Sequence, residues 1–167
     1  MEKPKTITVV IPTKNNQDTI SELLNSLMNQ SVKPDEIIVV DSSTDRTPSI
    51  VLGFPVKLIR TPANGANSAR NTGIKNSAGD IVAFIDGDCK ADKDWIKYIT
   101  QGFDNENIAC AGGSVKTLNL DTFFGLYGKL SWIPLMPEYK NNYTINDTNF
   151  LKRKPVSANM AVAKKNL

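Results

Sequence analysis

Runs of apolar residues recur along the first 115 residues of the chain, and most of them end at polar residues or glycine. Because these runs show no polar alternation, we expect each to form a short strand that is covered on both faces. The expected strands are 7–11, 36–41, 56–60, 81–85 and 108–115, and residues 156–167 close the chain as a strand that runs into a basic tail.

Between these runs, apolar residues recur at the three- and four-residue spacing of a helix. We expect one helix behind Asp18 as its N-cap, a second over 67–76 that Gly79 ends, and a third that Asp92 caps. Strands that alternate with helices indicate crossover connections and parallel strand pairs. The sequence therefore predicts one α/β domain over 1–167, with a Rossmann-like, mostly parallel sheet and helices on both faces.

Residues 118–155 break this alternation, because aromatic and aliphatic side chains gather there between polar ends. One interpretation is a helix and a proline-containing loop that pack on the sheet. The other is a partly exposed apolar flap beside a lipid or an acceptor, which predicts peripheral membrane contact through 118–139. Both interpretations stay open from the sequence.

Composition narrows the chemistry and the partners. The 167 residues are 40% hydrophobic and 22% charged, and a scattered formal net charge of +3 is too small to indicate a nucleic acid partner. Because the chain has no histidine, histidine-based acid–base catalysis and histidine metal ligands are excluded. Cys89 and Cys110 show neither metal-ligand spacing nor a disulfide pattern. We therefore expect a cytoplasmic protein, at the inner face of the membrane if 118–139 contacts lipid.

Polar residues directly follow three of the expected strands, in the segments TVVIPTKNN, IIVVDSSTD and AFIDGDCK. The carboxyl ends of parallel strands meet at one edge of a sheet, where open α/β folds bind their ligands. We therefore expect the polar residues of these segments to converge at that edge, namely Thr13, Asn15, Asp41, Asp86 and Asp88.

The pair Asp86 and Asp88 flanks Gly87 at the end of a buried run. Such a pair also occurs in solvated turns, and that interpretation stays open. Two adjacent carboxylates repel each other unless a cation lies between them, and ligation by oxygen alone suits Mg²⁺ or Mn²⁺. Because these ions complete their coordination with water and phosphates, we predict that the pair holds a divalent cation and the cation holds a diphosphate. Gly87 would let a ligand approach the backbone.

Asp41 and Arg70 are the other charged candidates. Asp41 is either a turn residue or an acceptor for a ribose hydroxyl or a base imino group. Arg70 is either a surface ion-pair residue or, on a helix that starts at the binding edge, a contact to phosphate or base. A P-loop motif is absent, and no G-x-G-x-x-G follows the first strand, which argues against a dinucleotide site.

The segments VVIPTKNNQDTISELLNSLMNQSVKPDEIIVVDSSTDRT and ANGANSARNTGIKNSAGDIVAFIDGDC together resemble the N-terminal nucleotide-binding half of family 2 glycosyltransferases with the GT-A fold. The resemblance runs from Thr6 to Leu167 and depends on I-P-T, V-V-D-S, A-R-N-x-G-I and D-x-D in that order. It implies that 1–115 form the nucleotide-sugar-binding half and that 116–167 begin the acceptor-side half.

The resemblance also implies a role for each matching residue. Pro12, Thr13 and Asn15 would line the nucleotide pocket. Asp41 would bind the base or ribose, and Arg70 the base or diphosphate. Asp86 would lie near ribose and metal, and Asp88 would be a metal ligand. Asn159, on the later strand, would lie beside the donor sugar and acceptor.

The implied activity is transfer of a sugar, with inversion, from a UDP- or GDP-sugar to a carbohydrate or lipid-linked acceptor, in polysaccharide or glycolipid biosynthesis. The resemblance places the catalytic base in a segment after the NMAV strand, so we expect the base beyond Leu167 and the GT-A domain to be C-terminally truncated. Many family members have a further acidic residue where this chain has Cys89, which we do not expect to be a nucleophile.

Two other functions stay open. A sugar-phosphate nucleotidyltransferase would share the sheet, the carboxylates and Mg²⁺, although PTKNNQDTI lacks the glycine-rich phosphate loop that such enzymes place after the first strand. A non-catalytic nucleotide-sugar-binding module would bind the donor with metal but neither transfer nor hydrolyse it.

Overall fold

The structure, a computed structural model, describes residues 4–116 and 156–167. Its sheet contains the strands β1 (Ile7–Thr13), β2 (Glu36–Asp41), β3 (Lys57–Arg60), β4 (Ile81–Ile85), β5 (Cys110–Gly112) and β6 (Asn159–Ala163). Its helices are α1 (Ile20–Met28), α2 (Thr47–Val51), α3 (Ala66–Asn76) and α4 (Trp95–Ile99), and a 3₁₀ turn, η1 (Lys164–Asn166), follows β6.

The strands form one six-stranded sheet in the order β3-β2-β1-β4-β6-β5. Strands β1 to β4 are parallel, whereas β6 is antiparallel to both β4 and β5. This confirms the predicted mostly parallel α/β sheet. Because β1 to β4 run in the same direction, their last residues share one edge, the carboxyl edge, and their first residues share the opposite amino edge.

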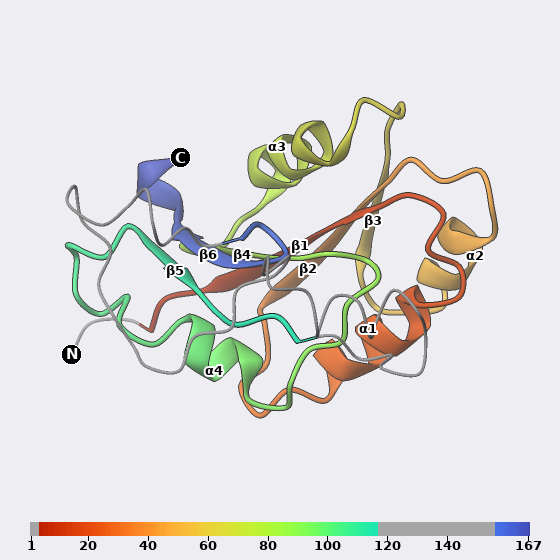
Figure 1. Cartoon of the computed structure of the whole chain (residues 1–167). Helices are drawn as coiled ribbons and strands as arrows, with labels where there is room; N and C mark the ends of the chain where they lie inside the picture. The colour runs from red at the N-terminus through yellow and green to blue at the C-terminus, as the bar shows by residue number, and fades with distance from the viewer. Residues whose placement is uncertain (1–3, 117–155) are drawn as a thin grey trace, which may run out of the picture.

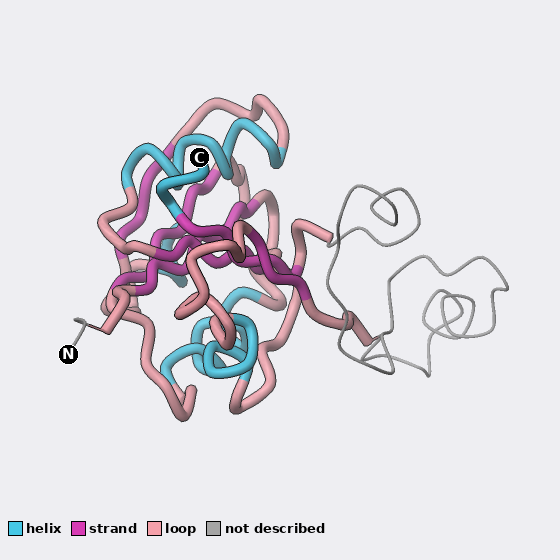
Figure 2. The backbone as a smooth tube through the Cα atoms, turned by 90° about the vertical axis from the view of Figure 1, so that its left-hand side faces the viewer, coloured by secondary structure: helices cyan, strands magenta, loops and turns pink. Residues whose placement is uncertain are grey.

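Helices cover both faces of the sheet (Figures 1 and 2). On one face, α1, α2 and α4 pack into the main core, to which Val51 and Trp95 contribute. On the other face lies α3, whose Ala69 packs with Ile38 and Val40 of β2. Because both faces are covered, the inner strands can be apolar at nearly every position, which is the pattern their sequences show.

The contact between α3 and β1 is close enough to require glycine. A Cβ atom added to Gly73 would lie 2.2 Å from Cγ1 of Val10. The close approach holds α3 against the sheet, and the helix carries Arg70 one turn before this contact. Gly73 therefore helps to set where the Arg70 side chain meets the carboxyl edge.

Several expected boundaries are wrong. β1 continues through Pro12 to Thr13, because it pairs with β4 only as far as Val10 and beyond that point pairs with β2 alone, so a proline is tolerated. α1 begins after Thr19 and has no side-chain cap, so Asp18 is not its N-cap.

The helix expected over 67–76 ends at Asn76 as predicted, but Gly79 does not end it. Gly79 packs against β1, where an added Cβ would lie 2.6 Å from the backbone N of Thr8. α4 begins after Asp94 rather than after Asp92. The five-residue α2 lies in a segment for which we predicted no element.

The predicted membrane-contact segment, 118–139, lies outside the described residues. Among the residues that the structure does describe, no helix is both long enough and apolar enough to cross a membrane.

Candidate functional site at the carboxyl edge

The sheet register brings the predicted site residues to one edge. Thr13 is the register partner of Asp41, and Asp41 is the register partner of Arg60, so the last residues of β1, β2 and β3 lie side by side. At the other side of β1, β4 ends at Ile85, and the antiparallel β6 places Asn159 opposite it. Asn159 therefore lies at the same edge as the residues that follow β4.

Asp41 is fully buried and its carboxylate is saturated with hydrogen bonds. The hydroxyls of Thr13 and Ser43 donate to Oδ1, the former at 2.8 Å. The backbone N–H of Ser43 and the Arg60 guanidinium donate to Oδ2, and Arg60 also donates to the carbonyl of Ser43 at 2.8 Å. Four donors fill the roughly four acceptor positions of a carboxylate. Asp41 thus joins three strand ends and the loop after β2.

Asn15 connects the loop after β1 to the loop after β2. Its backbone N–H donates to Oγ of Ser43 at 2.7 Å, and its Oδ1 accepts from the backbone N–H of Thr44 at 2.9 Å. Its φ of 57° lies in the left-handed region, which asparagine tolerates better than most residues. The side chain that we predicted for the nucleotide pocket therefore also fixes the shape of the loops, and Pro12 beside it is buried.

Arg70 reaches across from α3 to the end of β4. Its Nη2 donates to Oδ1 of Asp86 and its Nη1 to Oδ1 of Asn67 at 3.3 Å. The Arg70 side chain is 11% exposed and the Asp86 side chain 33% exposed, so the pair is open to solvent from the Asp86 side. The Nε atom of Arg70 is buried without a hydrogen-bond partner among the described residues. An orphaned guanidinium N–H is costly and marks a place where an acceptor is missing.

Gly87 packs against the loop after β1. An added Cβ would lie 2.8 Å from both Oδ1 of Asn16 and Cγ2 of Thr13, and the carbonyl of Gly87 accepts from Thr19 Oγ1 at 3.0 Å. Protein packing therefore gives its own reason for glycine here, and approach of a ligand to this backbone stays a prediction. The packing also links the end of β4 to Thr13, and through it to Asp41.

Asp88 is exposed, in contrast to Asp41. The backbone N–H of Cys89 donates to the carbonyl of Asp86 at 3.0 Å and closes a turn over Gly87 and Asp88. Burial, together with the negative charges of Asp88 and Asp86, raises the pKa of the Cys89 thiol to about 11. A thiol with so high a pKa is a poor nucleophile near neutral pH, in agreement with the sequence prediction.

The Asn159 side chain makes two hydrogen bonds and packs closely against Gly113. Its Oδ1 accepts from Nε1 of Trp95 at 2.8 Å, and its Nδ2 donates to the carbonyl of Ser114 at 2.9 Å. A Cβ atom on Gly113 would lie 2.6 Å from Nδ2. The Asn159 side chain thus holds α4 and the segment after β5 together, and its predicted contact with a donor sugar stays a prediction.

The oxygen ligands at the end of β4 fit a hard divalent cation. Asp86 is partly exposed and Asp88 is exposed, and the Arg70 guanidinium contacts Asp86. Within 4–116 and 156–167, no three acidic or cysteine side chains group in a way that would hold an ion by themselves. Mg²⁺ and Mn²⁺ commonly bind one or two protein carboxylates and take further ligands from water and phosphates. The residues therefore fit a cation that a diphosphate helps to coordinate.

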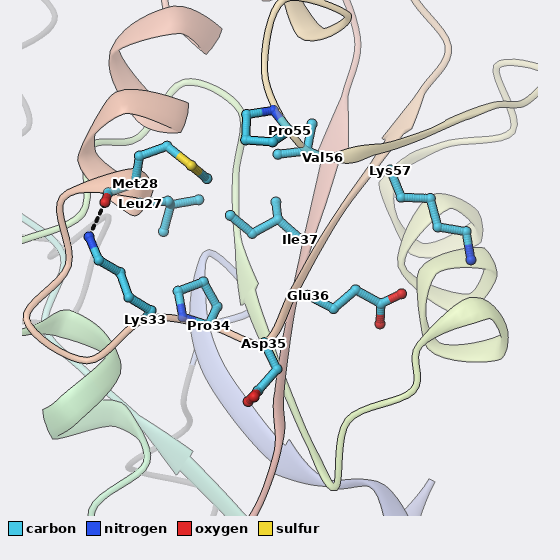
Figure 3. Close-up of a pocket in the computed structure, with 10 residues that line it drawn as sticks. All are labelled: Leu27, Met28, Lys33, Pro34, Asp35, Glu36, Ile37, Pro55, Val56 and Lys57. Atoms are coloured by element: carbon cyan, nitrogen blue, oxygen red, sulfur yellow. Dashed lines mark hydrogen bonds between the residues drawn. The ribbon is translucent and has the colours of Figure 1, made fainter.

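A separate pocket lies at the amino edge, away from these residues (Figure 3). It has a volume of about 430 Å³ and lies between the end of α1 and the first residues of β2 and β3. Its charged side chains bond to the backbone around it: Lys33 donates to the Met28 carbonyl, and Asp35 accepts from the Ile7 N–H at 2.7 Å. These contacts support the fold.

Comparison with known proteins identifies the family. The sequence model of Glycosyl transferase family 2 matches residues 8–161. This chain belongs to Glycosyl transferase family 2. The match runs from the second residue of β1 through β2, β3, β4 and the Asp86–Asp88 turn into β6.

Individual relatives agree with this assignment. Glycosyltransferase AglE of Haloferax volcanii is 33% identical over 119 residues, which are 66% of this chain and 39% of AglE. The structure of Staphylococcus aureus TarS 1–349 in complex with UDP-GlcNAc has a TM-score of 0.61 at 31% identity, over 68% of this chain and 35% of TarS 1–349. The mannosyltransferase PcManGT of Pyrobaculum calidifontis, in complex with GDP-Man and Mn²⁺, has a TM-score of 0.62 at 29% identity, over 68% of this chain and 36% of PcManGT.

The chain thus spans less than half the length of each of these proteins. The GT-A type of sheet is nevertheless shared with both solved structures, as the resemblance implied.

Sequence reasoning missed three residues that shape the site. Ser43 directly follows the V-V-D-S motif, and its position two residues after Asp41 is the spacing at which an Asp side chain accepts from the backbone. Arg60 ends β3 as Asp41 ends β2. Once the strand register is known, this pairing of opposite charges predicts their contact. Trp95 belongs to the main core, and no local pattern predicts its hydrogen bond to Asn159.

Proposed function

We propose that this chain is the donor-binding part of a glycosyltransferase that moves a sugar from a nucleoside diphosphate sugar to an acceptor hydroxyl. The observation that carries the proposal is the ion pair between Arg70 and the partly exposed Asp86 at the carboxyl edge, two residues before the exposed Asp88. Carboxylates for a cation and a buried guanidinium for an anion are the pair of features that a metal diphosphate requires. The family membership and the nucleotide sugars named with TarS and PcManGT support the same donor class.

The proposed roles follow from burial. Thr13, Asn15 and Asp41 form the rigid nucleoside side, and Pro12 lies buried beside them. Asp86 and Asp88 hold Mg²⁺ or Mn²⁺, and Arg70 directs its positive charge at the diphosphate. The cation, when bound, neutralises charge on the departing diphosphate. Arg70 and Asp86 already contact each other, so both are oriented before the donor arrives, which lowers the reorganisation that binding requires.

In the proposed reaction, the bond from the anomeric carbon to the diphosphate oxygen breaks and a bond from that carbon to the acceptor oxygen forms. The acceptor hydroxyl loses its proton to a base. A single in-line displacement inverts the anomeric centre. We propose a carbohydrate acceptor, since TarS is named a poly(ribitol-phosphate) β-N-acetylglucosaminyltransferase, and we keep the lipid-linked class beside it.

Calorimetric titration tests the donor site. The chain is titrated with UDP and with GDP, each with and without Mn²⁺, and the Asp88→Ala variant is compared with Asp18→Ala. Asp18 is an exposed carboxylate in the loop after β1, so its removal changes the charge equally without touching the turn. We expect Mn²⁺-dependent binding of one nucleotide, lost in Asp88→Ala and retained in Asp18→Ala.

Absence of binding to both nucleotides by the folded chain would overturn the proposal. Binding of a nucleotide sugar without transfer or hydrolysis, in the presence of carbohydrate acceptors, would instead favour a binding module.

A further inference from the structure

Arg60 occupies the acceptor position on Asp41 that a nucleoside would need. The carboxylate of Asp41 already accepts from four donors, two on each oxygen. A carboxylate offers about four lone-pair positions, so a fifth donor has no place to bind. If the nucleoside is to donate an N–H or O–H to Asp41, one of the present donors must leave.

The four donors differ in what their departure would cost. Thr13 is 4% exposed and Ser43 2% exposed, so releasing either hydroxyl or the Ser43 N–H would leave a buried polar group unpaired. The Ser43 hydroxyl also accepts from the Asn15 N–H at 2.7 Å, which ties it further into the loops. The Arg60 side chain is 50% exposed and water can replace its bonds. Arg60 is therefore the donor that can be exchanged.

Departure of Arg60 alone is unfavourable, because it would leave a buried carboxylate one donor short of its full set. The exchange is favourable only when another donor takes the same oxygen, Oδ2. The place vacated by the guanidinium lies at the carboxyl edge, in register with Asp41 and Thr13. A hydrogen-bond donor of a base or ribose would meet Asp41 there.

We propose that Arg60 is an exchangeable counter-ion of the nucleoside site: it holds Asp41 in the donor-free protein and moves into solvent when the nucleoside takes its place on Oδ2. This inference rests on the proposed function, since it assumes that a nucleoside diphosphate binds at this edge. Arg60 then acts as a specificity residue, because a ligand without a donor in that position gains nothing from displacing it.

The proposal makes a prediction whose sign opposes simple electrostatics. Removing a cation near an anion site should weaken the binding of every diphosphate. Removing a competitor for Asp41 should favour the nucleoside diphosphate over pyrophosphate, which has no nucleoside. The decisive quantity is therefore the ratio of the pyrophosphate Kd to the nucleoside diphosphate Kd, measured with Mn²⁺.

The test compares Arg60→Ala with Arg46→Ala. Arg46 is an exposed arginine in the segment between β2 and α2, so its removal takes the same charge from the same edge without touching Asp41. Because half-exposed ion pairs are weak, we expect the ratio to rise about two- to fivefold in Arg60→Ala and to stay constant in Arg46→Ala. The Arg60→Gln variant keeps an N–H donor for Asp41 but carries no charge. It should fold even if Arg60→Ala does not, and the Kd ratio should rise less in it than in Arg60→Ala.

If wild-type protein binds the nucleotide but the Kd ratio stays constant or falls in both Arg60 variants, this inference is overturned and the proposed function is not. Wild-type protein that binds neither nucleotide would remove the proposed function and this inference with it.

Discussion

The ends of β2 and β4 follow one sequence pattern and have opposite environments. Each strand is a buried apolar run that passes directly into an aspartate. Asp41, the last residue of β2, is fully buried and bonded on both oxygens, whereas Asp86 is one-third exposed and Asp88 is exposed. The pattern of apolar residues followed by aspartate therefore places a carboxylate at the edge without determining whether it is available to a ligand.

The difference arises from the neighbouring strands. Asp41 has an in-register partner on both sides, Thr13 in β1 and Arg60 in β3. Asp86 lies one residue beyond the end of β4, where β6 supplies Asn159 opposite Ile85 and no residue opposite Asp86. The carboxylate within the ladder acquires partners from the neighbouring strands, whereas Asp86 beyond it is paired by Arg70 of α3 and stays one-third exposed.

Removal of the Asp41 carboxylate should have the largest effect. Asp41→Ala leaves the hydroxyls of Thr13 and Ser43 and the Arg60 guanidinium without their acceptor, so we expect a loss of about 2–4 kcal/mol in the free energy of unfolding. Urea unfolding measures it, with Asp18→Ala as the control for loss of a carboxylate. An unchanged unfolding midpoint would show that the saturated network does not stabilise the fold.

Asp88→Ala should leave stability unchanged and instead weaken nucleotide binding. Its carboxylate is exposed, and the side-chain contact described for it is with the Cys89 thiol at 3.8 Å, so the midpoint of urea unfolding should stay the same. We expect nucleotide affinity in Mn²⁺ to fall on the order of a hundredfold, because a direct metal ligand is lost. Titration with and without EDTA measures this. Equal nucleotide affinity of the wild-type protein and Asp88→Ala, with and without EDTA, would remove the metal assignment.

Gly87→Ala should disturb the junction between the two strand ends. The added methyl group would collide with Asn16 and Thr13, at 2.8 Å from an atom of each. We expect a loss of about 1–3 kcal/mol in unfolding free energy from overpacking. The control is Gly65→Ala, whose Cβ would meet no atom within 4 Å and whose cost comes from its φ of 88° alone. A Gly87→Ala protein as stable as wild type would mean that the two loops can separate.

The smallest effect concerns Cys89 in the metal-free protein. Burial and the charges of Asp88 and Asp86 raise its pKa to about 11, so the thiolate fraction should increase about tenfold per pH unit between pH 8 and 10. Iodoacetamide labelling in EDTA, followed by peptide mass spectrometry, measures the rate. Asp88→Ala removes one negative charge, lowers the pKa and should speed labelling at pH 9. A rate that is the same in both proteins would mean that Asp88 has no influence on the thiol.

Much of the sheet could be predicted from the sequence. The strand over 36–41 and the strand over 81–85 have the predicted bounds, because each apolar run is covered on both faces and is bounded by charged residues. The end of β1 was missed, since the tolerance of Pro12 depends on where the neighbouring β4 stops pairing. The helix α2 was missed because five residues with a proline in the first turn carry too little helical periodicity.

The convergence of the site residues was also predictable, because parallel strands share an edge. Their contacts were not. The engagement of Asp41 depends on which residue of β3 lies in register with it, and that register is a tertiary property. The contact between Arg70 and Asp86 depends on how closely α3 approaches β1 at Gly73, which no local pattern reports.

The position of β6 has a consequence for the order of folding during synthesis. β6 lies between β4 and β5, although it is synthesised after both, so among the described strands β5 has no neighbour in the sheet until 159–163 arrive. At ribosomal rates of about 5–20 residues per second, roughly fifty residues correspond to about 3–10 s of waiting. During that interval the four parallel strands can already pair with one another. The edge of β4 that will later pair with β6 remains open to other chains. The chain should therefore depend most on chaperones between the synthesis of β5 and that of β6.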